Sequence, residues 1–69
     1  MTSGEAIRAR REELGLGTRE LARKAMISHS NIVRWEEGES IITTDKVIKL
    51  AQILDCTTDY LLGMDIKSK

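Results

Sequence analysis

The sequence has no proline, no phenylalanine and a single cysteine among its 69 residues, and its charges cancel. One cysteine excludes an internal disulfide and a cysteine-rich zinc site, and it favours a reducing compartment such as the cytoplasm. With one Tyr and one Trp, the core must be aliphatic. No apolar run approaches the roughly 18 residues of a membrane helix, and no signal-peptide pattern opens the chain. We therefore predict no membrane association.

The length and the charge pattern narrow the possibilities further. Folding domains mostly contain roughly 50–200 residues, so this chain is predicted to form one domain. A net charge of zero argues against coating a polyanion by bulk charge, and any nucleic-acid binding must depend on local placement. Residues 1–24 hold six basic and four acidic side chains (net +2), residues 25–45 one and four (net −3), and residues 46–69 four and three (net +1). This distribution fits a solvated surface of mixed sign or, more specifically, a weakly basic face beside an acidic loop.

Helix-start and helix-stop residues predict five short helices and no strand, which is an all-α fold. The first helix begins at the capping-box pair Thr2 and Glu5 and runs to about residue 14. The next three are predicted at about 18–25, 29–37 and 44–54, and a short fifth helix follows Thr57 and ends at Gly63. Ser28 and Thr43 are predicted N-caps, and Gly38 stands where a left-handed residue ends the third helix.

The apolar spacing predicts one aliphatic core. Its predicted members, helix by helix, are Ala6, Ile7 and Leu14; Leu21, Ala22 and Ala25; Ile32 and Trp35; Val47, Ile48, Leu50, Ala51 and Leu54; and Tyr60, Leu61 and Leu62. Trp35 is interpreted as core rather than as a base-stacking platform, and Cys56 as a small buried hydrophobe rather than a nucleophile. Two interpretations stay open for Ile41 and Ile42, which either tuck under their loop or join a subunit contact.

The second and third predicted helices have the outline of a helix-turn-helix motif. Leu21 and Ala25 share one face of the second helix, and Ile27 fills the turn. Ala22 must be small because the two helices cross closely there. The outward side of the third helix is then left with short polar side chains, which suits contact with base edges.

At these residues the chain resembles the Cro/repressor-type (Xre-like) helix-turn-helix family, which includes lambdoid phage repressors. The matching pieces are Ile7-Arg8, Arg11, Leu16, Glu20-Leu21-Ala22, Ser28, Ile32, Arg34-Trp35-Glu36, Gly38, Leu50-Ala51, Leu54 and Asp59-Tyr60-Leu61-Leu62-Gly63. The resemblance implies a compact five-helix DNA-binding domain over residues 1–63, with a short tail or linker at 64–69. It also implies a dimeric bacterial or phage regulator of transcription that acts in the cytoplasm on a palindromic operator.

Carried over by position, the resemblance assigns roles to individual residues. The third helix would contact bases in the major groove through His29, Ser30, Asn31, Val33 and Arg34. Thr18, Arg19, Ser28 and Ser40 are assigned to the phosphate backbone, and Arg11 and Glu36 to a structural ion pair. His29 is alternatively an exposed residue with no task. No second His or Cys lies at ligand spacing, so no metal site is predicted, and no cofactor is expected.

Three features depart from the family pattern. Thr18 stands where the family often has Gln, and Met26 stands at a turn position usually occupied by Gly. The loop after the third helix, which is often basic, carries Glu37 and Glu39 here, and these carboxylates would repel a nearby phosphate.

Two functional hypotheses follow, and a third has no support. The first is a sequence-specific, dimeric DNA-binding repressor or regulator acting on double-stranded DNA. The second is a protein-interaction module on the same fold that antagonises another regulator, suggested by the neutral charge, the acidic loop and the Ile41–Ile42 pair. An enzyme is not predicted, because no arrangement of nucleophile and base is recognisable.

Overall fold

The computed structural model describes residues 2–63, which form five α-helices and contain no strand. The helices are α1 (Ser3–Glu13), α2 (Thr18–Ala25), α3 (His29–Glu36), α4 (Thr44–Ile53) and α5 (Thr58–Leu61). The all-α prediction is confirmed, and the first four helices begin and end within one residue of their predicted limits. The tail predicted at 64–69 lies outside the described residues.

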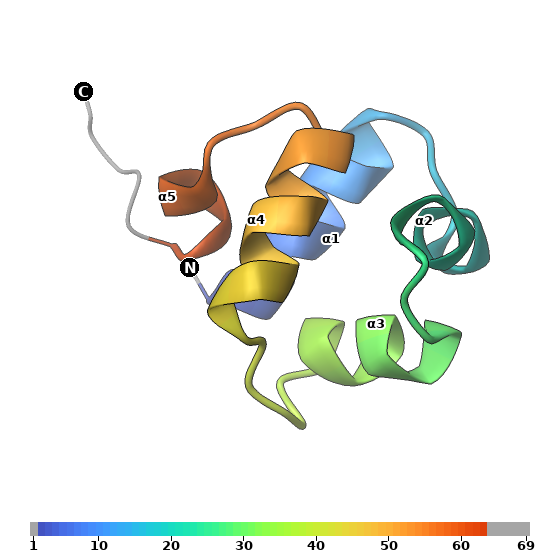
Figure 1. Cartoon of the computed structure of the whole chain (residues 1–69), viewed down its shortest axis with the longest axis horizontal. Coiled ribbons are helices and arrows are strands. Elements are labelled where there is room, and N and C mark those ends of the chain that lie inside the picture. Colours follow the sequence, from blue (N-terminus) through green and yellow to red (C-terminus); the bar gives the residue numbers. More distant parts are fainter. Residues whose placement is uncertain (1, 64–69) are drawn as a thin grey trace.

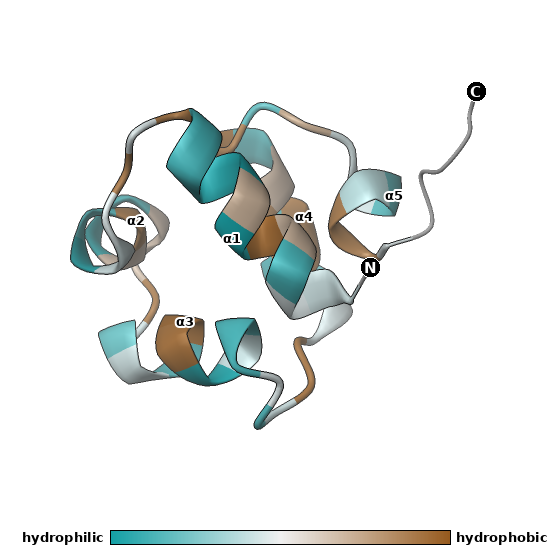
Figure 2. Cartoon of the chain, turned by 180° about the vertical axis from the view of Figure 1, so that it is seen from behind, coloured by the Kyte–Doolittle hydropathy of each residue, from teal (hydrophilic) through white to brown (hydrophobic). Residues whose placement is uncertain are grey.

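The five helices enclose one core. The helix α1 packs against α3 and α5, while α4 packs against α2 and α5. In Figure 1, α2 and α3 lie to one side of the central pair α1 and α4, and α5 lies on the opposite side. Apolar residues gather at the centre of the view, where α1 and α4 overlap, and the outer turns of α1 are hydrophilic (Figure 2). The helix-turn-helix pair is therefore held at one edge of a shared core.

Side-chain capping is present at the start of α1 and α5 but not at the start of α2, α3 or α4. Thr2 accepts a hydrogen bond from the Glu5 N–H, and the Glu5 carboxylate accepts one from the Thr2 N–H, so the capping box is present. Gly38 has a φ of 77°, as expected for a left-handed residue after a helix. Ser28 and Thr43 occupy the predicted N-cap positions of α3 and α4, and neither side chain makes a cap hydrogen bond.

Most of the predicted core is confirmed. The buried apolar residues are Ala6, Ile7, Leu21, Ala22, Ala25, Ile27, Ile32, Trp35, Val47, Leu50, Ala51, Leu54 and Leu61. Three predicted members, Leu14, Ile48 and Leu62, are exposed instead. Leu14 and Leu62 are the C-cap residues of α1 and α5, beyond the turns that face inward. Ile48 follows the buried Val47, and one residue turns a helix by about 100°, which carries Ile48 to the outer flank of α4.

The turn that ends α2 is strained at Met26. Its backbone is left-handed, with φ 55° and ψ 42°. The turn is closed by the Ile27 N–H, which donates to the Ala22 carbonyl at 3.0 Å. The Met26 side chain is 86% exposed and contributes little to the core. The fold thus needs a glycine-like conformation at a position that holds methionine.

Replacing Met26 with glycine is expected to stabilise the fold. Glycine adopts the left-handed conformation without a clash at Cβ, so Met26→Gly should raise the free energy of unfolding by about 1 kcal/mol. Urea unfolding followed by circular dichroism measures the change. The control Met26→Ala removes the exposed side chain but keeps the Cβ, and it should stay close to the original protein. A glycine variant no more stable than the alanine variant would contradict the strain.

Candidate nucleic-acid interface

The helices α2 and α3 are joined by a tight turn and pack against each other (Figure 1). Leu21 and Ala25 from α2 and Ile32 from α3 are fully buried, and Ile27 in the turn is 7% exposed. Because these apolar side chains fix the two helices face to face, the remaining side of α3 is left free of core contacts. Trp35 is buried, which confirms its interpretation as core.

The outward face of α3 carries all five side chains assigned to bases. Ser30 and Arg34 are exposed, and His29, Asn31 and Val33 are partly exposed. None of them belongs to the buried core. The hydroxyl oxygens of Ser28 and Ser30 lie 2.8 Å apart and share a hydrogen bond. Ser28 thus contacts a neighbour on the same surface instead of capping α3.

The first residues of α2 and α3 are linked directly. The Thr18 Oγ1 atom lies 2.9 Å from the His29 Nε2 atom, so these side chains form a hydrogen bond between the two helices of the motif. Both side chains are partly exposed. The start of α2 and the start of α3 therefore present one continuous polar surface. The sequence did not predict this contact, since the two residues are 11 positions apart.

The helix α1 also contributes to this surface. Arg8 on α1 lines a depression of about 180 Å³ together with Thr18 and Val33. The Arg8 side chain is exposed and forms an i,i+4 ion pair with Glu12 at 3.5 Å. Sequence reasoning missed Arg8 as a candidate phosphate contact because it lies outside the helix-turn-helix segment, and only the packing of α1 brings it beside Thr18.

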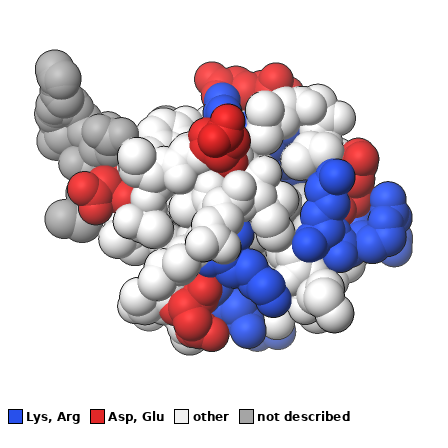
Figure 3. All heavy atoms as spheres, turned by 45° about the horizontal axis from the view of Figure 1, so that its top comes forward, with Lys and Arg blue, Asp and Glu red and all other residues white. Residues whose placement is uncertain are grey.

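Charge is distributed unevenly around the interface. The helix α2 carries Arg19, Arg23 and Lys24, and basic side chains gather on the side of the molecule that α2 occupies (Figure 3). Glu37 and Glu39 after α3 are exposed. The surface thus offers positive charge at α2 and negative charge at the far end of α3.

The two isoleucines of the loop between α3 and α4 lie in different environments. Ile42 is partly buried and packs against the core, whereas Ile41 is 93% exposed. Ser40 is partly buried and lines a pocket of about 340 Å³ with Trp35 and Ile41. Of the two interpretations left open for this pair, tucking under the loop holds for Ile42, and Ile41 remains a candidate contact residue.

The interface is supported from behind by Arg11 and Glu36. The Arg11 Nε and Nη2 atoms donate to the two Glu36 carboxylate oxygens at 2.8 and 3.0 Å, and Nη1 donates to the Leu16 carbonyl at 2.8 Å. The two side chains are only 10% and 6% exposed. The hydrogen bond to Glu36 raises the pKa of Arg11 above its usual value. This pair joins α1, the following loop and the end of α3, so it sets the position of the interface helix.

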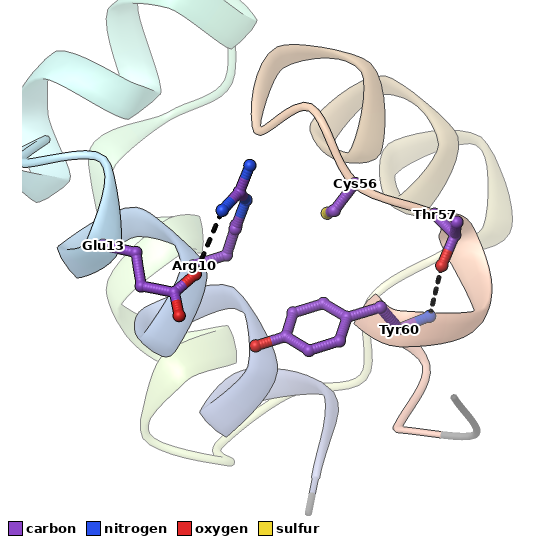
Figure 4. Close-up of a pocket in the computed structure, with 5 residues that line it drawn as sticks. All are labelled: Arg10, Glu13, Cys56, Thr57 and Tyr60. Carbon is purple, nitrogen blue, oxygen red and sulfur yellow. Dashed lines mark hydrogen bonds and ion pairs between the residues drawn. The ribbon is translucent and has the colours of Figure 1, made fainter. Parts of the chain in front are cut away.

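A separate pocket lies away from the motif, between α1 and α5. It has a volume of about 300 Å³ and is lined by Arg10, Glu13, Cys56, Thr57 and Tyr60. Figure 4 shows the Cys56 side chain pointing toward the space between Arg10 and Tyr60. Burial raises the pKa of the Cys56 thiol, which is the opposite of nucleophile activation. The Arg10 Nε atom donates a hydrogen bond to the Leu54 carbonyl at 2.8 Å, and Nη2 donates one to the Asp55 carbonyl at 3.1 Å.

Within residues 2–63, no group of three His, Cys, Asp or Glu side chains is placed to hold a metal ion. No helix in that part of the chain is long and apolar enough to cross a membrane.

A tight turn between two packed helices, with a polar outer face on the second, defines a helix-turn-helix protein. The chain belongs to the helix-turn-helix family, whose model matches residues 7–61. It is 37% identical over 94% of its length to the transcriptional regulator DicA of Escherichia coli and 33% identical over 100% to the regulator ImmR of Bacillus subtilis. It spans about half of these relatives, covering 48% and 54% of them. Both relatives are HTH-type transcriptional regulators.

Solved structures show the same fold. The P22 c2 repressor bound to a synthetic operator superposes with a TM-score of 0.86 at 34% identity, covering 94% of this chain and 98% of the repressor chain. The solution structure of the P22 c2 repressor DNA-binding domain gives 0.87 at 32% identity, covering 100% and 91%. The predicted resemblance to Cro/repressor-type domains is therefore confirmed.

Proposed function

We propose that this chain is a sequence-specific, DNA-binding regulator of transcription, acting as a repressor, whose α3 lies in the major groove. The observation that carries the proposal is the outer face of α3. Its inner face is taken up by Ile32 and Trp35, so the polar side chains between residues 29 and 34 face away from the core. The relatives named above are transcriptional regulators, and one structural neighbour is a repressor bound to a synthetic operator.

The side chains on this face suit particular bases. Arg34 can pair with guanine through two hydrogen bonds, Asn31 can pair likewise with adenine, and Val33 can contact the methyl group of thymine. Ser30 and His29 can bind several base edges. In this proposal Thr18, Arg19, Ser28 and Ser40 contact phosphates, and residues 1–63 form the DNA-binding domain. The free N–H groups at the start of α2 favour a phosphate there.

We further propose that two copies bind a palindromic operator. Half-sites one helical turn apart, roughly 34 Å, fit a dimer of helix-turn-helix domains. The exposed Ile41 supports an apolar contact to a second protein surface. The carboxylates of Glu37 and Glu39 would weaken non-specific attraction to DNA, so affinity would depend on base contacts and on the paired half-sites.

Selection of bound DNA from a random pool at low salt tests the proposed function directly. The expected result is an enriched sequence with two-fold symmetry. Sedimentation of the protein alone and on that sequence measures the number of copies bound. If no sequence is enriched above the starting pool, the proposed function is wrong.

Two arginine variants should separate base contacts from phosphate contacts. Arg34→Ala is expected to cost about 1–3 kcal/mol on the selected site and to relax preference at one base pair. Arg19→Ala should weaken binding to all sequences and lower the salt slope by about 1. Fluorescence titration over a salt series measures both effects, and Lys49→Ala on α4 serves as control. Equal loss of specificity in all three variants would contradict these roles.

A protein partner is the second candidate function. The observation that favours it is Ile41, an isoleucine that is 93% exposed beside the carboxylates Glu37 and Glu39. In this case the domain would bind and antagonise another regulator through the loop after α3. A pull-down that recovers only further copies of this chain would speak against it.

A further inference from the structure

The hydrogen bond between Thr18 and His29 joins a residue assigned to phosphate with a residue assigned to a base. The Thr18 hydroxyl has one proton to donate, whereas a neutral imidazole has one donor nitrogen and one acceptor nitrogen. With Nε2 at 2.9 Å from Thr18 Oγ1, only Nδ1 of His29 is left for DNA. Among the described residues, Nδ1 has no hydrogen-bond partner of its own.

Two proton arrangements satisfy this contact in the free protein. Either Nε2–H donates to Thr18 Oγ1 and leaves Nδ1 as an acceptor, or the Thr18 hydroxyl donates to Nε2 and leaves Nδ1–H as a donor. These two arrangements present opposite hydrogen-bonding groups to a base. Whatever fixes the Thr18 proton therefore also fixes what His29 can bind.

We propose that a DNA phosphate at Thr18 sets the tautomer of His29 and thereby makes His29 select an amino-bearing base, adenine or cytosine. This inference rests on the proposed function. Phosphate oxygens only accept hydrogen bonds, so a phosphate at the start of α2 takes the Thr18 proton. The Oγ1 atom must then accept from Nε2–H, and Nδ1 is left with a lone pair.

The chemistry of the major groove turns this lone pair into a preference. Adenine N6 and cytosine N4 carry N–H donors there, whereas guanine N7 and O6 and thymine O4 are acceptors. An Nδ1 acceptor forms a hydrogen bond with the first two bases and faces repulsion from the others. Thr18 acts as a positioning residue, because it touches the phosphate and determines specificity only through His29.

The partial burial of both side chains supports this coupling. Each side chain is partly buried against the protein and keeps part of its surface exposed. The threonine side chain is also short, and its hydroxyl lies against the His29 ring, 2.9 Å from Nε2. Thr18 stands where the family often has the longer glutamine, and this difference fits an effect of Thr18 that passes through His29.

The test compares base preference between variants on the selected site. The base that His29 contacts is defined as the position whose preference is lost in His29→Ala. At that position the original protein and Thr18→Ser, which keeps the hydroxyl, should favour adenine or cytosine by roughly 2- to 12-fold, as expected for one hydrogen bond. Thr18→Val, which has the same shape without the hydroxyl, should lose this preference while other positions keep theirs.

A second arm removes the phosphate charge instead of the hydroxyl. A methylphosphonate placed at the phosphate contacted by Thr18 should reduce the same preference in the original protein and leave Thr18→Val unchanged. Thr58→Val at the start of α5 is the matched control, since α5 lies on the side of the molecule opposite α2 (Figure 1). Thermal unfolding of all variants shows whether the fold is kept.

The outcomes distinguish this inference from the proposed function. If a site is selected but Thr18→Val keeps the base preference, or if the original protein favours guanine or thymine at the His29 position, the tautomer relay is wrong and DNA binding stands. If no site is selected at all, the proposed function fails and the relay fails with it.

Discussion

Replacing Arg11 with alanine is expected to lower the free energy of unfolding by about 3–5 kcal/mol, the range found when one partner of a buried ion pair is removed. Arg11→Ala leaves the Glu36 carboxylate buried without the two hydrogen bonds at 2.8 and 3.0 Å that now neutralise it. It also leaves the Leu16 carbonyl without its Arg11 donor. Urea unfolding at neutral pH, followed by circular dichroism, measures the loss.

The helix α1 itself supplies a matched control. Arg8 pairs with Glu12 at 3.5 Å, and both side chains are largely exposed, at 61% and 60%. Such surface pairs contribute about 0–1 kcal/mol, so Arg8→Ala should change stability far less. In the double variant with Arg11→Ala and Glu36→Ala, the loss should be smaller than the sum of the single losses. If Arg11→Ala costs no more than Arg8→Ala, the pair is not a structural link.

Adding a single methyl group at Gly4 should be almost as damaging. A Cβ on Gly4 would overlap the Trp35 carbonyl oxygen and would lie 3.0 Å from the Glu36 Cα. Both obstacles are backbone atoms of α3, which cannot rotate aside as a side chain can. The helices α1 and α3 would have to separate, and Gly4→Ala is expected to cost at least about 3 kcal/mol, the upper end for overpacking.

The comparison for Gly4 is another glycine in open space. Gly17, the N-cap residue of α2, has a φ of −80°, and a Cβ added there would meet no atom from outside its chain neighbours within 4 Å. Gly17→Ala should therefore cost below about 1 kcal/mol. Unfolding midpoints in urea at low temperature, where a weakened domain is still measurable, give both values. Equal midpoints for the two variants would show that α1 and α3 tolerate separation.

The Arg11–Glu36 pair could be predicted from the sequence, whereas the role of Gly4 could not. Arg11 and Glu36 were assigned as a pair because their positions match a family pattern, not because any spacing places them together. Gly4 gave no indication of its role, since a glycine near a helix start is also compatible with simple chain flexibility. Only the approach of α1 to the end of α3 shows that its hydrogen atom occupies space no carbon could fill.

The apolar residues of α4 also show what the sequence can and cannot predict. Val47, Leu50 and Leu54 follow helical spacing along α4 and its C-cap, and all three are buried as expected. Ile48 is equally apolar but exposed. Periodicity identifies a stripe, but its width depends on which neighbours are present. Here α4 packs against α2 and α5, and the flank of α4 that carries Ile48 stays exposed.

Local propensity and short-range spacing were enough to predict five helices, most of their limits and most of the aliphatic core. The helix-turn-helix family was predicted from the resemblance of particular residues to the family pattern. The tertiary structure alone decided the link between Thr18 and His29, the place of Arg8 beside α2, the close approach at Gly4 and the division between Ile41 and Ile42. Each of these depends on how two segments meet in space. The zero net charge follows the same rule, since its effect on the proposed DNA binding depends on which charges the packing brings to the face of α3.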